Sequence, residues 1–128
     1  MYKRQSLASP VWSHFGKERG LPISCFGSNI DDDMGNILYT QSEIVMMSKL
    51  GGGTSGYFGH IRSRGAEVKD NGVASGAVHI MQLFESMVDV VSQGSVRRGR
   101  FSPYLPVEHN DIEAVSYTHL TLPTSVTV

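Results

Sequence analysis

The clearest pattern in the chain is a stripe of apolar positions that repeats with helical spacing across residues 75–94. The stripe consists of Ala77, Ile80, Met81, Phe84, Met87, Val88 and Val91. This period predicts an amphipathic helix whose apolar side lies in the core. Ser75 is placed to cap the amino terminus, and Gly94 is placed to end the helix. We therefore expect the methionines to be core residues without a cofactor role.

A second helix is predicted over residues 40–51. Thr40 and Glu43 have the spacing of a capping box, and Gly51 stands where a glycine often follows the last helical residue. The apolar positions between them recur at intervals of three, at Ile44, Met47 and Leu50. The polar segment before this helix, residues 31–36, is predicted to be a turn, with room for one helical turn.

Two apolar segments favour strands. Residues 21–30 are bounded by Pro22 and Gly27 and include the single cysteine, whereas residues 100–106 are cut short by prolines. The order is therefore strand, helix, glycine-rich segment, helix, strand. This order predicts an α/β fold class, and the 128 residues suffice for one modest domain.

The glycine-rich segment raises a question about packing, because seven of the 14 glycines fall between Gly51 and Gly72. Gly51, Gly53 and Gly56 match G-x-G-x-x-G, but here the motif follows a helix instead of opening one, so a dinucleotide-binding turn is rejected. Tyr57 and Phe58 replace the lysine and hydroxyl residue of a phosphate-binding loop. A helix end explains Gly51 only, so we expect another group to lie against the remaining backbone.

Composition excludes several function classes. The net charge of −1 provides no long-range attraction to nucleic acid or to an anionic membrane, and no apolar run approaches the length of a membrane span. The N-terminus lacks an apolar stretch after its basic residues, so we expect a cytoplasmic protein. One cysteine excludes an internal disulfide, and the histidines show no metal-ligand spacing. The run of aspartates at 31–33 is of a type that binds divalent metal, but the EF-hand pattern around it is absent, so no metal site is expected there.

The arginines of segment 92–100 allow two interpretations. Arg97, Arg98 and Arg100 lie between glycines just after a predicted helix, a setting that suits phosphate binding and equally suits a solvated basic turn. Binding of single-stranded nucleic acid through "SVRRGRF" is a further possibility, but the near-zero net charge counts against it.

Composition changes abruptly after Glu113. All 23 charged residues lie at or before it, and the last 15 residues have none. The string "AVSYTHLTLPT" resembles the translation of a sequencing adapter. We interpret residues 114–128 as a non-native artefact tail and residues 1–113 as the biological part, which is expected to continue further in the source gene.

Four segments, in order, resemble the large (alpha) subunit of class I ribonucleotide reductase. They are "SPVWS", "ISCFGSNIDD", "KLGGGTSGYFGHIRSRGAEV" and "SQGSVRRGRFSPYLPVEHNDIE". The resemblance covers residues 1–113 but only a small part of a family chain. It implies the first half of a ten-stranded α/β barrel that reduces ribonucleoside diphosphates to 2′-deoxyribonucleoside diphosphates by thiyl-radical chemistry. It also implies an alpha homodimer, a radical-generating beta subunit with a di-metal centre, and thioredoxin or glutaredoxin as reductant.

The resemblance implies roles for particular residues. Cys25 is the redox-active cysteine, and the residues that contact substrate are Ser9 (threonine in many members), Ser24, Gly52 and Gly53. The positions that contact a deoxynucleoside triphosphate or ATP effector are Asp32, Asp33, Met34 and Arg62. Gln93 and Arg97 belong to the specificity loop that links effector to substrate base. No metal ligand is implied in this chain.

A thiol suits the role implied for Cys25, because at neutral pH it is mostly protonated and supplies both a proton and reducing equivalents. Its partner cysteine and the radical cysteine are absent from the sequence, so we expect the fragment itself to be inactive. The alternative is a standalone deoxynucleotide-binding regulatory module without redox activity, which uses Asp32, Arg62 and the arginine loop.

Overall fold

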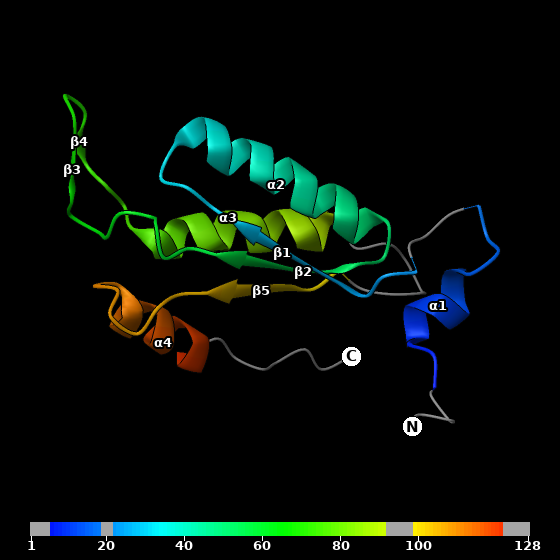
Figure 1. Cartoon of the computed structure of the whole chain (residues 1–128). Helices are drawn as coiled ribbons and strands as arrows, with labels where there is room; N and C mark the ends of the chain where they lie inside the picture. Colours follow the sequence, from blue (N-terminus) through cyan, green and yellow to red (C-terminus); the bar gives the residue numbers. More distant parts are fainter. Residues whose placement is uncertain (1–5, 19–21, 92–98, 122–128) are drawn as a thin grey trace, which may run out of the picture.

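The computed structural model describes residues 6–18, 22–91 and 99–121, and Figure 1 shows their arrangement. The helices are α1 (Ser9–His14), α2 (Met34–Lys49), α3 (Ala77–Val90) and α4 (Ile112–Thr121). The strands are β1 (Cys25–Asn29), β2 (Gly53–Tyr57), β3 (Glu67–Val68), β4 (Gly72–Val73) and β5 (Phe101–Tyr104). The α/β class predicted from the sequence is confirmed.

A parallel sheet in the order β1-β2-β5 forms the centre of the molecule. Cys25 pairs with Gly53, and Thr54 pairs with Phe101. Parallel neighbours require crossover connections, which α2 supplies between β1 and β2 and α3 supplies between β2 and β5. A short antiparallel hairpin of β3 and β4 extends from the chain between β2 and α3 (Figure 1).

The central strand β2 is the glycine-rich segment, which the sequence pattern did not identify as a strand. Its glycines are required by close packing. A Cβ on Gly56 would lie 2.8 Å from Ile30 Cδ1 and 3.0 Å from Phe101 Cζ, and a Cβ on Gly52, just before the strand, would lie 2.7 Å from the Phe26 ring. The bare backbone therefore lets neighbouring apolar side chains lie directly against the middle of the sheet.

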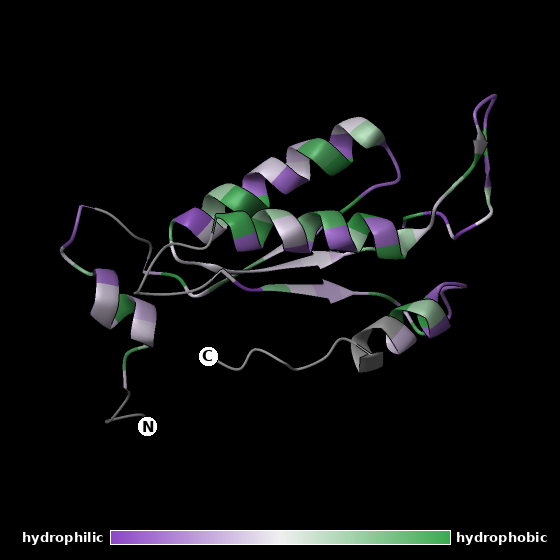
Figure 2. Ribbon diagram, turned by 180° about the vertical axis from the view of Figure 1, so that it is seen from behind, coloured by the Kyte–Doolittle hydropathy of each residue, from purple (hydrophilic) through white to green (hydrophobic). Residues whose placement is uncertain are grey.

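Helices α2 and α3 cover one face of this sheet, as Figure 2 shows from behind. The core between them consists of Ile30, Ile37, Ile44, Phe58, Ile61, Ala77, Met81, Phe84 and Val88. Burial alternates along the strands, with Thr54 and Gly56 buried under the helices. The alternate side chains of β1 and β5, Cys25 and Tyr104 among them, are exposed on the opposite face. This second face, with Gly27, Asn29 and Ser102, is called the open face below.

The start of α2 differs from the prediction. The helix begins at Met34, six residues before the predicted Thr40, because the Asp33 carboxylate accepts a hydrogen bond from the Asn36 backbone N–H at 3.0 Å and caps the helix. Thr40 is buried within the helix. The predicted end is confirmed, since Gly51 follows the C-cap with a φ of 91°.

The start of α3 also differs by one residue. The N-cap is Gly76, with a φ of 92° and no side-chain cap of its own, instead of Ser75. The Asp111 carboxylate takes the capping role, because it accepts a hydrogen bond from the Ala77 N–H at 2.9 Å. The predicted stop, Gly94, lies outside the described residues.

Helix α4 crosses the predicted junction at Glu113. It runs from Ile112 to Thr121, and Val115 packs against the edge of the core. The interpretation of residues 114–128 as an artefact tail stays a prediction. Among the helices that the structure describes, none is long and apolar enough to cross a membrane.

Candidate functional site

The residues predicted to contact substrate gather at the amino ends of β1 and β2. Cys25 begins β1 and pairs with Gly53, which begins β2. The Gly53 N–H donates to the Ser24 carbonyl at 2.7 Å, and a Cβ on Gly53 would lie 3.8 Å from Cys25 Sγ. Three of the predicted residues are therefore direct neighbours. The Cys25 side chain is exposed on the open face, where a ligand has access to it.

Two further predicted residues lie at the same end of the sheet in different settings. Gly52 is buried against Phe26, and its N–H donates to the Met47 carbonyl at 3.1 Å. Ser9 is the exposed first residue of α1, which lies beyond the amino ends of the strands in Figure 1. Helix α1 meets the glycine segment through His14, whose ring would be 3.6 Å from a Cβ on Gly51.

The residues predicted to contact the effector lie at the opposite, carboxyl ends of the strands. Arg62, which follows β2, donates from Nε to Asp32 Oδ2 at 2.5 Å, and Asp32 follows β1. Both side chains are about one-third exposed, at 35% for Arg62 and 28% for Asp32. The pair is therefore formed yet accessible to a charged ligand.

The two residues after Asp32 have different surroundings. One oxygen of Asp33 is engaged in capping α2, and Met34 is the exposed first residue of that helix. Both are near the ion pair along the chain. Their contact with an effector stays a prediction. Gln93 and Arg97 lie outside the described residues.

Gly99, two residues before β5, is held closely between α2 and α3. A Cβ there would lie 2.6 Å from Ser48 Oγ and 2.9 Å from the Val88 carbonyl oxygen. The next residue, Arg100, accepts hydrogen bonds on its carbonyl from the N–H and the hydroxyl of Thr54. The return of the chain into β5 is therefore fixed by packing from α2, α3 and β2.

Sequence reasoning missed the turn after β5, which we call the 108–111 turn. Within it, His109 Nε2 lies 2.7 Å from the Ile61 carbonyl, and the Asp111 N–H donates to His109 Nδ1 at 3.1 Å. Asp111 is 6% exposed and accepts from the Arg64 N–H at 3.0 Å. The contacts to Ile61 and Arg64 join residues 48 and 47 positions apart, so no local pattern in the sequence indicates them.

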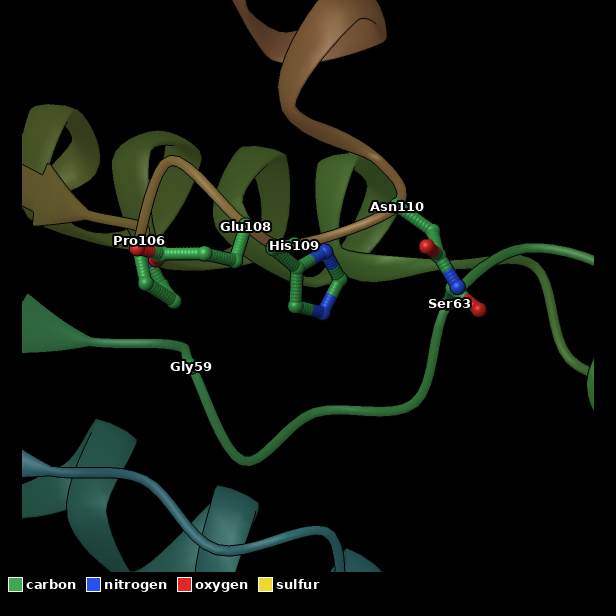
Figure 3. A pocket seen from close by; sticks show the side chains of 6 residues that line it. All are labelled: Gly59, Ser63, Pro106, Glu108, His109 and Asn110. Carbon is green, nitrogen blue, oxygen red and sulfur yellow. The ribbon is translucent and has the colours of Figure 1, made fainter.

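The 108–111 turn also forms one wall of an open pocket of about 380 Å³. Figure 3 shows the lining residues, which come from the loops after β2 and β5: Gly59, Ser63, Pro106, Glu108, His109 and Asn110. In the described part of the chain, no three His, Cys, Asp or Glu side chains are grouped so as to hold a metal ion.

Comparisons with known proteins identify the family of the chain. The family model described as "Ribonucleotide reductase, barrel domain" matches residues 23–119. A vitamin B12-dependent ribonucleoside-diphosphate reductase of Mycobacterium tuberculosis is 37% identical over 105 residues, which make up 81% of this chain and 15% of that protein. A ribonucleoside-diphosphate reductase subunit alpha of Chlamydia muridarum is 32% identical over 111 residues, 86% of this chain and 11% of that protein.

A solved structure gives the same result. The class Id ribonucleotide reductase alpha subunit of Actinobacillus ureae is 48% identical to this chain, with a TM-score of 0.72 over 84% of this chain and 19% of that one. The chain therefore spans between about one-tenth and one-fifth of the length of these relatives. From the family match and these similarities together, the chain belongs to the ribonucleotide reductase family and represents part of its barrel domain.

Proposed function

We propose that the chain is a piece of the alpha subunit of a class I ribonucleoside-diphosphate reductase, a cytoplasmic enzyme that converts ribonucleoside diphosphates to 2′-deoxyribonucleoside diphosphates. The 48% identity to a class Id alpha subunit, over 84% of this chain, supports class I. The working subunit is an alpha homodimer that receives its radical from a beta subunit with a di-metal centre. In this proposal residues 1–113 are native barrel sequence and residues 114–128 are foreign.

One observation carries the proposal: Cys25 is exposed on the open face, beside Ser24 and Gly53 at the amino ends of two paired strands. A small-residue surface around a thiol allows a nucleotide to lie close to the sulfur atom. The residues that hold the ribonucleoside diphosphate there are Ser9, Ser24, Gly52 and Gly53.

The chemistry of Cys25 is a two-electron reduction. The C2′–O bond of the substrate breaks, the oxygen leaves as water with a proton from a thiol, and a hydrogen takes its place on C2′. Cys25 and a second cysteine, supplied by sequence that this chain does not contain, are oxidised to a disulfide. Thioredoxin or glutaredoxin then reduces that disulfide by thiol–disulfide exchange. The chain alone, without the second cysteine and the radical cysteine, is inactive.

The carboxyl ends of the strands hold the effector. Asp32, Asp33, Met34 and Arg62 contact a deoxynucleoside triphosphate or ATP, and the Arg62 guanidinium pairs with phosphate oxygens. Gln93 and Arg97 relate the identity of the effector to the choice of substrate base.

The test uses the full-length alpha subunit that carries this segment. The pre-reduced subunit is given its beta subunit and substrate without an external reductant, and the products are analysed by peptide mass spectrometry. We expect one deoxynucleotide per active site and one new disulfide that contains Cys25. The Cys25→Ser variant is expected to make no product. Product formation with Cys25 still present as a free thiol contradicts the proposal.

A second experiment tests whether the reductase belongs to class I. The same full-length subunit is assayed with adenosylcobalamin in place of the beta subunit. We expect turnover only with the beta subunit. Turnover that depends on adenosylcobalamin contradicts class I and leaves the role of Cys25 in place.

A further inference from the structure

The short segment of residues 61–64, which includes Arg62, is held at both of its ends by the 108–111 turn. On one side of Arg62, the Ile61 carbonyl lies 2.7 Å from His109 Nε2. On the other side, the Arg64 N–H lies 3.0 and 3.2 Å from the two carboxylate oxygens of Asp111. The backbone on both sides of Arg62 is therefore bound by a turn that is distant in the sequence.

The hydrogen bonds define the role of each ring nitrogen of His109. Nδ1 accepts the Asp111 N–H at 3.1 Å, so the proton lies on Nε2, which donates to the Ile61 carbonyl. The imidazole thus links the turn to the Arg62 segment in one defined orientation.

Asp111 connects the same segment to a third element. Its Oδ2 also accepts from the Ala77 N–H at 2.9 Å, at the amino terminus of α3. A Cβ on Gly76 would lie 2.7 Å from that oxygen and 2.9 Å from Arg64 Cβ. A glycine is therefore needed where the 108–111 turn, the segment with Arg64 and the start of α3 meet. A buried carboxylate that accepts from two backbone N–H groups, one of them shared between both of its oxygens, is a strong and directional anchor.

These contacts restrict the backbone of Arg62, from which its side chain extends. Its backbone is fixed on both sides by His109 and Asp111, and its guanidinium is oriented by Asp32. An arginine whose base is already ordered loses less entropy when it binds a phosphate group than a mobile one.

We propose that His109 and Asp111 are positioning residues that hold Arg62 ready for the triphosphate of the effector. This inference rests on the proposed effector role of Arg62. It predicts that a loss of either anchor weakens effector binding while the reduction of substrate, at the other end of the sheet, continues.

The test measures effector affinity by isothermal titration with dATP and with dTTP in the full-length alpha subunit. Asp111→Asn replaces one acceptor oxygen by an amide that faces backbone donors, and His109→Leu removes the donor to Ile61. Each is expected to raise the effector Kd about tenfold. His109→Gln keeps a side-chain N–H and is expected to restore affinity to within about twofold of the wild type. Glu108→Gln is the matched control, because it removes a carboxylate from an exposed position of the same turn.

Turnover and melting temperature are measured on the same proteins. We expect kcat at saturating effector to stay within about twofold of the wild type, which a general loss of folded enzyme does not allow. If Asp111→Asn and His109→Leu lower kcat and Tm together with affinity, the positioning role is overturned.

The variant Arg62→Ala separates this inference from the proposal on which it rests. If Arg62→Ala weakens effector binding while Asp111→Asn and His109→Leu do not, the inference fails and the effector role of Arg62 survives. If Arg62→Ala leaves the effector Kd unchanged, the effector role of Arg62 fails, and the inference fails with it.

Discussion

Arg62 and Asp32 join the carboxyl ends of two neighbouring parallel strands through one ion pair, in which Nε donates to Oδ2 at 2.5 Å. The two residues are 30 positions apart in the sequence and come together because β1 and β2 are paired in register. The carboxyl ends of parallel strands are a common place for ligands in α/β folds. A partly exposed guanidinium there is available to an anionic ligand.

We expect Asp32→Asn in the full-length subunit to raise the effector Kd about fivefold to tenfold, because a neutral amide orients the guanidinium less strongly than a carboxylate does. Effector titration by calorimetry measures the change. Glu18→Gln, which removes an exposed carboxylate from the segment after α1, serves as the charge-matched control. Equal affinities of Asp32→Asn and the wild type contradict a role for Asp32 in this site.

Gly56→Ala tests why the central strand contains glycine. The new methyl group would lie 2.8 Å from Ile30 Cδ1 and 3.0 Å from Phe101 Cζ, so we expect the free energy of unfolding to fall by about 1–3 kcal/mol. Gly27→Ala on the neighbouring strand meets only Ser55 Oγ at 3.4 Å and is expected to change it by less than about 0.5 kcal/mol. Urea unfolding of the full-length alpha subunit, with each substitution in turn, measures the two changes. Equal losses in both variants would contradict a specific packing requirement at Gly56, because the unfolded-state entropy term of a glycine-to-alanine change is stabilising at either site.

Resequencing of the source DNA across the codon for Glu113 tests the artefact tail. We expect the reading frame to continue into barrel sequence that encodes two further cysteines, one to pair with Cys25 and one to act as the radical. A frame that ends in "VSYTHLTLPTSVTV" shows instead a genuine short chain, in which reductase chemistry is lost.

Residues 1–113 expressed alone are expected not to fold independently. The described sheet has β1 and β5 as outer strands, and its open face is covered by neither α2 nor α3. Exposed edges of this kind favour association with other chains. We expect poorly dispersed amide signals in an NMR spectrum, unchanged by added deoxynucleoside triphosphate. A dispersed spectrum that shifts with nucleotide supports the standalone binding module instead.

The parts of the fold that the sequence predicted are those in which a local pattern determines the structure. The apolar stripe around Phe84 gave α3 within one residue of its start, and Gly51 correctly marked the end of α2. The segment around Cys25 was predicted as a strand over residues 21–30, and the strand in the structure, Cys25–Asn29, is half as long as expected.

The central strand could not be predicted in this way, because its residues lack apolar alternation and glycine is disfavoured in strands. Gly53 and Gly56 are stabilised in extended form by neighbours on β1 and β5, which are distant in the sequence. The start of α3 was missed for a similar reason, since its cap is the carboxylate of Asp111, 34 positions away.

In the candidate site, too, some residues could be identified from the sequence and others could not. The resemblance to a family pointed to Cys25, Asp32 and Arg62, and the structure groups them with neighbours at the two ends of one sheet. His109 and Asp111 had no signal of their own, because their partners are backbone atoms, and any residue type supplies a carbonyl or an N–H.

The length of β2 has a consequence for how the two ends of the sheet change over time. Its five residues place roughly 13 Å between Gly53 and Tyr57, the first and last positions of the strand. Substitutions at sites farther apart than about 7–10 Å usually add in their effects on stability. Substitutions near Arg62 and near Cys25 are therefore expected to add in their effects on the free energy of unfolding, so each end of the sheet can accumulate changes without amplifying the stability cost of changes at the other end.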